Sequence, residues 1–189
     1  LIAGLAGIAA SMLLLAYGFG SATYTIHDDA VAGLSQKIDA TALAPLVGQT
    51  YPSDTAFRAA AIDALGSASY QTHESDLLTA ALSINPALIL FGILAFVASF
   101  AMSLGPVMWV LFSELFSNRM RGIAISFVGL INSAVSFGVQ LIFPWELQNL
   151  GNSKTFLLYA VFALVGLPLV MKLLPETKGK SLEALEAEL

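Results

Sequence analysis

Hydrophobic and polar positions divide the chain into four long apolar runs separated by shorter polar segments. The apolar runs cover residues 1–22, 85–115, 122–145 and 154–174. An α-helix of about 20 apolar residues crosses a bilayer core of about 30 Å, and each run reaches that length. We therefore predict four transmembrane helices.

Residues 23–84 form an acidic segment that interrupts this pattern. It predicts a helix from Thr55 to Leu65, with Asp54 as N-cap and Gly66 at the end, and a second short helix from Glu74 to Ala81. We predict a soluble helical insert outside the membrane, and we expect it to cover the outer mouth as a lid. The charged residues are Asp28, Asp29, Asp39, Asp54, Asp63, Glu74 and Asp76 against Lys37 and Arg58.

Basic residues predict the orientation of the spans. Arg119 and Arg121 lie in the turn at residues 116–121, and further lysines lie at and beyond the end of the last span, in the tail at residues 175–189. Short loops rich in Lys and Arg stay in the cytoplasm, whereas long loops count little. The turn and the tail are therefore predicted to be cytoplasmic, with the insert and the loop at residues 146–153 on the outer side.

Composition supports a membrane protein and excludes several other classes. Hydrophobic residues make up 57% of the chain, charged residues 11%, and the mean hydropathy is +0.80, whereas a soluble domain has about a quarter charged residues. The net charge of −5 disfavours a nucleic-acid partner, which needs a basic face. No Cys is present, and His27 and His73 lack zinc-like spacing. We expect no metal, no cofactor and no enzyme activity, and an all-α membrane fold.

Two features inside the spans are candidates for function. Gly105-Pro106 interrupts the second run, and a membrane helix tolerates such a break where neighbours or water satisfy the freed backbone groups. In the third run, Asn132, Ser136 and Gln140 follow i, i+4, i+8 spacing and share one face. Polar groups are costly toward lipid, so we expect this face to look into protein or a water-filled cavity.

The residues around the Gly-Pro break resemble the sugar porter family of the major facilitator superfamily. The family pattern G-P-x-x-W-x-x-x-S-E-x-F-P-x-x-x-R-G is matched at Gly105, Pro106, Trp109, Ser113, Glu114, Phe116, Arg121 and Gly122, and Ser117 replaces the usual Pro. The tail sequence P-E-T-K-G-x-S-L-E, from Pro175 to Glu183, resembles the C-terminal signature of the same family. This resemblance implies that the four runs correspond to helices nine to twelve of a twelve-helix fold.

The resemblance also implies roles for individual residues. Trp109 would lie against the sugar, Asn132 would hydrogen-bond its hydroxyls, and Phe100 and Gly105 would approach the pocket. Glu114 and Arg121 would belong to a cytoplasmic charge cluster that gates the transporter. A packing aromatic and a solvated ion pair are the structural alternatives. Ser133 and Ser136 depart from the family, which tends toward Trp and Asn there.

These observations together predict the C-terminal part of a secondary active sugar transporter, with sugar/proton symport, working by alternating access. Its partners would be a monosaccharide (hexose or pentose), protons, the lipid bilayer and the missing N-terminal helices of the same protein. Its location would be the bacterial inner membrane. A transporter-like sugar sensor and a uniporter are the alternatives.

Overall fold

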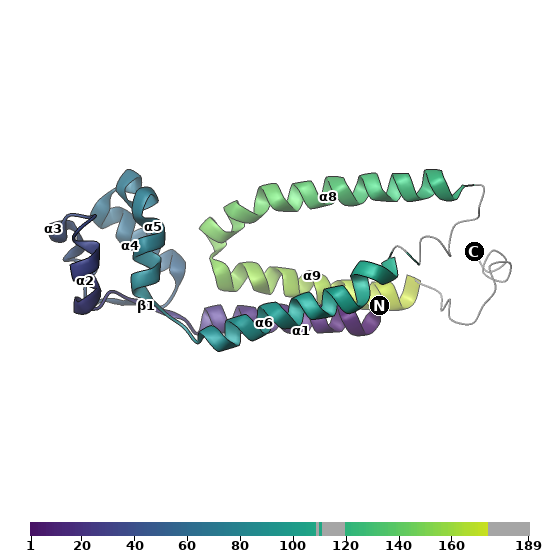
Figure 1. Cartoon of the computed structure of the whole chain (residues 1–189), viewed down its shortest axis with the longest axis horizontal. Helices are drawn as coiled ribbons and strands as arrows, with labels where there is room; N and C mark the ends of the chain where they lie inside the picture. Colours follow the sequence, from purple (N-terminus) through teal and green to yellow (C-terminus); the bar gives the residue numbers. More distant parts are fainter. Residues whose placement is uncertain (109, 111–119, 174–189) are drawn as a thin grey trace. The chain divides into compact units, whose positions relative to one another are not determined.

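The computed structural model describes residues 1–108, 110 and 120–173 of the 189-residue chain (Figure 1). Within these residues, four helical segments are long and apolar enough to cross a membrane. They are α1 (Ile2–Gly20), the segment Pro86–Met108 that begins with α6 (Pro86–Ser99), α8 (Arg121–Leu150) and α9 (Asn152–Leu173). The prediction of four membrane-spanning helices is confirmed.

Helix α6 begins where its sequence predicts. The side-chain oxygen of Asn85 accepts hydrogen bonds from the backbone N–H groups of Ala87 (3.1 Å) and Leu88 (3.3 Å). Pro86 occupies the first helical position, where a missing N–H has no consequence because that group has no partner inside the helix. Asn85 and Pro86 thus fix the start of the second span.

The end of α8 differs from the sequence prediction. A loop was expected at residues 146–153, but α8 continues through Pro144 to Leu150, and α9 starts at Asn152. Membrane helices accommodate an internal proline more readily than soluble ones. Only Gly151 separates the two helices, with a φ of +82° that glycine adopts without strain. Residues 150–153 are called the α8–α9 junction below.

The insert, residues 23–84, contains a small sheet in addition to helices. Its antiparallel strands have the order β2-β1-β3, with Tyr24 of the central strand opposite Tyr51 on one side and Leu82 on the other. The sequence predicted helices alone, because strands of two or three residues are too short to show a period of two. The elements are β1 (Thr23–Thr25), α2 (Asp28–Leu34), α3 (Ala40–Leu43), β2 (Thr50–Tyr51), α4 (Asp54–Leu65), α5 (Ser67–Ala81) and β3 (Leu82–Ser83).

The insert has a hydrophobic core of its own. Phe57 is fully buried at its centre, stacking on Tyr24 with ring centroids 5.8 Å apart and meeting Tyr51 edge-on at 5.7 Å. Such a contiguous cluster is what defines an independently packed unit. The other buried members are Ala22, Ile26, Leu34, Ile38, Leu43, Leu46, Ala61, Tyr70, Leu77 and Ala81.

Helix α4 confirms its predicted span but not its predicted cap. Ser53, in extended conformation, is the N-cap, and its Oγ accepts a hydrogen bond from the N–H of Ala56 at 3.2 Å. Gly66 ends the helix with a φ of +79°, as expected. Because Ser53 caps the helix, the carboxylate of Asp54 lies at the first helical position and is available for other partners.

The described residues divide into two compact units, and each is treated separately. The first unit comprises the described parts of Leu1–Leu13, Phe91–Trp145 and Leu157–Leu189. The second comprises Leu14–Leu90 and Glu146–Phe156. The predicted sugar-contact residues described by the structure fall in the first unit, and the insert and the α8–α9 junction fall in the second.

Candidate functional site

The Gly105-Pro106 break lies at the end of a π-helical turn, η1 (Phe100–Leu104), which directly follows α6. The N–H of Gly105 donates to the carbonyl oxygen of Phe100, five residues earlier. Pro106 has no N–H, and its ring would clash with a carbonyl of a regular helix, so the wider turn accommodates it. π-turns are rare and occur frequently at functional sites.

Two of the predicted sugar-contact residues lie together at this turn. A methyl group added to Gly105 would lie 3.4 Å from the carbonyl oxygen of Phe100 and 3.6 Å from its ring carbon Cε1. The Phe100 ring therefore lies beside Gly105, at a distance where a methyl group would make ordinary contact with it. About half of this side chain, 49%, is exposed, so the turn presents an aromatic surface beside a glycine.

Asn132 lies in α8, apart in sequence from this turn, and it is exposed together with Ser136 and Gln140. No described residue of α8 is buried, so the partner of this polar face stays a prediction. Arg121 is the first residue of α8 and is partly buried. Trp109 and Glu114 lie outside the described residues.

Small residues form a close contact between the first two spans. A side chain on Gly4 would collide with Ser103, and one on Gly7 would lie 3.0 Å from Cβ of Ser99. Ser103 is buried, and its Oγ donates to the carbonyl oxygen of Leu1 at 3.4 Å. Small residues let membrane helices approach closely, and Gly4 and Gly7 serve this packing here.

A cavity of about 340 Å³ lies beside this contact. It is lined by Gly4, Ser99 and Ser103 together with apolar groups such as Met102 and Val107. The η1 turn therefore borders this cavity as well as the packed residues of α1. The spacing of Ser99 and Ser103, i and i+4, was the signal that could have located this contact from sequence.

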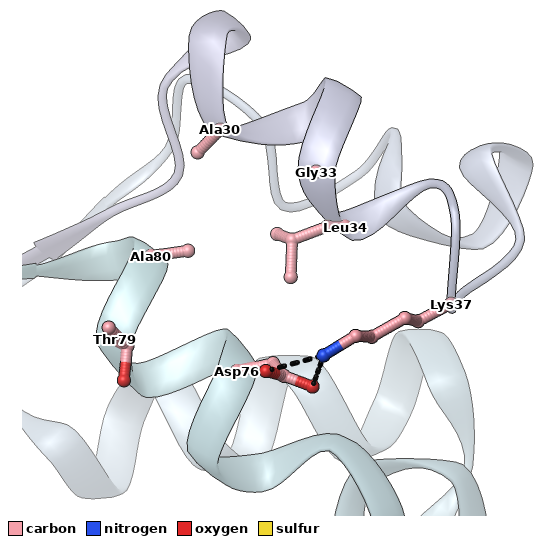
Figure 2. Close-up of a pocket in the computed structure, with 7 residues that line it drawn as sticks. All are labelled: Ala30, Gly33, Leu34, Lys37, Asp76, Thr79 and Ala80. Atoms are coloured by element: carbon pink, nitrogen blue, oxygen red, sulfur yellow. Dashed lines mark hydrogen bonds and ion pairs between the residues drawn. The ribbon is translucent and has the colours of Figure 1, made fainter.

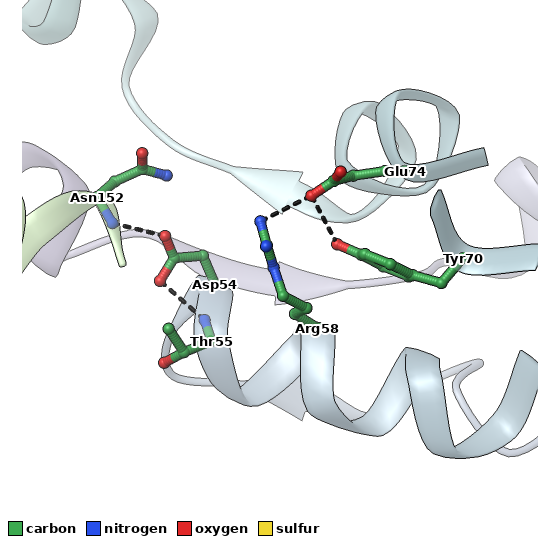
Figure 3. A network of polar contacts seen from close by, with 6 residues as sticks. All are labelled: Asp54, Thr55, Arg58, Tyr70, Glu74 and Asn152. Atoms are coloured by element: carbon green, nitrogen blue, oxygen red, sulfur yellow. Dashed lines mark hydrogen bonds and ion pairs between the residues drawn. The ribbon is translucent and has the colours of Figure 1, made fainter. Parts of the chain in front are cut away.

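The insert contains a polar network that joins α4 to α5 (Figure 3). Arg58 Nη2 lies 2.7 Å from Glu74 Oε1, the hydroxyl of Tyr70 donates to the same oxygen at 3.2 Å, and the Arg58 guanidinium lies 5.8 Å from the centre of the Tyr70 ring. Burial raises the pKa of Tyr70 to about 12, with Arg58 opposing and Glu74 reinforcing the shift. Tyr70 is therefore neutral at ordinary pH, and its hydroxyl and the Arg58 guanidinium both contact the Glu74 carboxylate.

A shallow groove of about 370 Å³ lies between α2 and α5 (Figure 2). Lys37 closes one end by reaching both carboxylate oxygens of Asp76 at 2.9 Å. Both side chains are about half exposed, so this ion pair is weak, about 0–1 kcal/mol. Small and apolar residues form the rest of the lining, including Ala30, Gly33, Leu34 and Ala80. Nothing in this lining singles out a ligand.

Comparison with known proteins identifies the family. The family model described as "Sugar (and other) transporter" matches residues 60–189, about two thirds of the chain. The chain belongs to this sugar transporter family. The predicted resemblance is thereby confirmed, and the four apolar helices make this sugar transporter chain an integral, multi-pass membrane protein of the major facilitator fold.

Individual relatives agree with the family. The chain is 41% identical over 102 residues to an ERD6-like sugar transporter of Arabidopsis thaliana, covering 54% of this chain and 21% of the relative. It is 38% identical over 116 residues to the probable metabolite transport protein CsbC of Bacillus subtilis, covering 60% and 25%. It is also 38% identical over 104 residues to the D-xylose-proton symporter of Escherichia coli, covering 52% and 21%.

These matches cover about a fifth to a quarter of the relatives' length. No solved structure matches the chain. The family match begins at residue 60, inside α4, so α1 and the first half of the insert lie outside it. The correspondence of α1 to a ninth helix stays a prediction.

Proposed function

We propose that the chain supplies helices nine to twelve of a secondary active sugar transporter that works by alternating access with proton symport. The observation that carries the proposal is the π-turn at Phe100–Leu104, which interrupts a membrane span directly before Gly105-Pro106 and lies within the family match. Irregular backbone at membrane depth is tolerated where it lines a cavity or is buried in protein. Transporters place substrate sites at such interrupted helices.

The proposed substrate is a monosaccharide, a hexose or a pentose. A sugar offers C–H faces that pack on aromatic rings and hydroxyls that need hydrogen-bonding partners. Phe100 beside Gly105, together with Trp109, would supply the apolar wall, and the amide of Asn132 would both donate to and accept from hydroxyls. The relatives that support this class include the D-xylose-proton symporter of Escherichia coli and a glucose transporter of Staphylococcus epidermidis.

The remaining partners follow from the exposed apolar surface of α8. Large apolar side chains are exposed along its whole length, and such a surface needs an apolar environment. We assign this cover to the lipid bilayer and to the N-terminal helices of the same protein. The exposed side chains are Ile123, Phe127, Leu130, Ile131, Val135, Phe137, Val139, Leu141, Ile142 and Trp145.

The proposed orientation places the turn at residues 116–121 and the tail in the cytoplasm, with the insert outside the bacterial inner membrane. In that orientation Arg121, at the start of α8, and Glu114 would lie at the cytoplasmic surface. We propose that they form part of a charge cluster whose contacts change as the transporter opens inward.

Sugar binding and uptake by the full-length protein, with and without a protonophore, test the proposal. Asn132→Ala should weaken sugar binding about five- to tenfold, because a net hydrogen bond contributes about 1 kcal/mol. Ser133→Ala, one position further round the same helix, is the matched control and should bind as the wild type does. Accumulation that survives the protonophore would contradict proton symport, and equal effects of the two variants would contradict the Asn132 assignment.

A further inference from the structure

A single carboxylate joins the insert to the last membrane helix. Oδ2 of Asp54, in the first turn of α4, accepts a hydrogen bond from the backbone N–H of Asn152 at 2.7 Å (Figure 3). Its other oxygen, Oδ1, accepts from the N–H of Thr55 at 2.8 Å. The two bridged residues are 98 positions apart in the chain. Asp54 therefore uses both oxygens, one within the insert and one at the α8–α9 junction.

The position of Asn152 makes this contact favourable. Asn152 is the first residue of α9, and N–H groups in the first turn of a helix have no partner inside the helix. The start of a helix also carries partial positive charge, which favours a carboxylate. A hydrogen bond to an ionised acceptor is stronger than one between neutral groups. Asp54 thus provides an acceptor for a backbone N–H of α9, although the two residues are far apart in the sequence.

The absence of a side chain at Gly151 leaves room for the Asp54 carboxylate. A side chain at this position would collide with Oδ1 of Asp54 and would lie 3.1 Å from Cγ2 of Thr55. Its φ of +82° is also unfavourable for any residue with a Cβ. Two glycines of the insert, Gly48 and Gly66, have similar positive φ but open space where a side chain would be. The close approach is therefore particular to the junction.

Further contacts hold the junction on the same side. Tyr24 of β1 is buried, and both Asp54 and the side chain of Asn152 lie near enough to affect the pKa of its hydroxyl. Ser153 Oγ donates to the carbonyl oxygen of Ala16 in α1 at 2.8 Å. The rings of Phe19 and Phe156 stack with centroids 5.3 Å apart. The first turn of α9 is consequently held by the insert and by the end of α1.

We propose that the insert is a docked brace, in which Asp54 clamps the α8–α9 junction so that insert and junction move as one body. The sequence predicted a partly ordered lid over the outer mouth, and such a lid would need no clamp on the α8–α9 junction. Joint movement during transport rests on the proposed function, whereas the contact between Asp54 and the junction does not. Asp54 is in this sense a positioning residue.

Hydrogen exchange of the full-length protein in lipid nanodiscs tests the clamp without any sugar. In Asp54→Ala, we expect the Asn152 amide and its neighbours in the first turn of α9 to exchange at least about tenfold faster than in the wild type. Asp63→Ala removes an exposed acid from the same helix and should leave this exchange unchanged. Unchanged exchange in Asp54→Ala, or equal acceleration in both variants, would overturn the proposal.

A second pair of variants keeps the test decisive if Asp54→Ala loosens the whole insert. Gly151→Ala adds a collision with Asp54 to the positive-φ strain, whereas Gly48→Ala adds the strain alone. Gly151→Ala should therefore accelerate exchange at Asn152, and Gly48→Ala should not. Because the collision needs the carboxylate, Gly151→Ala should add less in an Asp54→Ala background than in the wild type. Fully additive effects would overturn the clamp.

Discussion

The core of the insert depends on one aromatic side chain, and its removal gives a quantitative prediction. Phe57 has no exposed surface and contacts the rings of both Tyr24 and Tyr51. Replacing a buried Phe by Ala costs about 3–5 kcal/mol, through lost burial and the cavity left behind. The insert spans residues 23–84, and a unit of this size has a free energy of unfolding of about 3–9 kcal/mol. We expect Phe57→Ala to remove about half or more of that stability.

The assay is hydrogen exchange of the intact chain in nanodiscs as urea is increased, followed at the amides of α4 and α5. Phe57→Leu should lie between wild type and Phe57→Ala, because it leaves a smaller cavity. Phe162→Ala, which removes a ring that is 65% exposed in α9, is the matched control and should leave the insert unchanged. Equal protection of the α4 and α5 amides in Phe57→Ala and Phe162→Ala would contradict this prediction.

Three further predictions concern other parts of the chain. Gly7→Ala should destabilise the protein in a thermal-shift assay, because the added methyl group would meet Ser99. Gly129 has open space around it, so Gly129→Ala should stabilise the helix by up to about 1 kcal/mol. A change of the same sign in both variants would contradict the close contact at Gly7. The pKa values of Tyr24 and Tyr70 are both raised by burial to about 12, from an unfolded value of about 10. Their contribution to stability is therefore fully present below about pH 10 and lost as pH rises toward 12, and Tyr24→Phe should flatten that decline in urea titrations. Trp109→Ala should weaken sugar binding while membrane insertion, measured by protease accessibility, stays normal; unchanged binding in an inserted variant would rule out the contact.

The membrane spans could be predicted from sequence because length and apolarity alone determine them. The irregular turn at Gly105-Pro106 could also be predicted, since proline lacks the N–H of a regular helix and its ring clashes with a preceding carbonyl. The extension of α8 past Pro144 was missed, because a membrane helix can retain an internal proline where neighbouring groups satisfy the freed backbone carbonyl. The sequence rule for helix breaks therefore held at Pro106 but not at Pro144.

The contacts of Asp54 show a different limit. Its position at the start of α4 suggested a cap for its own helix, and Ser53 takes that role instead. Its partner Asn152 is 98 residues away, and no periodicity connects the two. The short strands were missed for a similar reason, because their pairing depends on residues distant in the chain. The sugar-contact assignments came from the family motif, and Trp109→Ala and Asn132→Ala test them.

The pairing of β1 with β3 has a consequence for how the chain can vary in length. Thr23, just after α1, lies opposite Ser83, just before α6. The two ends of the insert therefore lie side by side. The distance between the end of α1 and the start of α6 does not depend on the length of the insert. A segment with adjoining ends can be shortened, exchanged or fused to a reporter without stretching its host, and longer loops carry only a slowly growing entropic cost. New sequence is therefore best placed in parts of the insert away from Asp54, which contacts the α8–α9 junction.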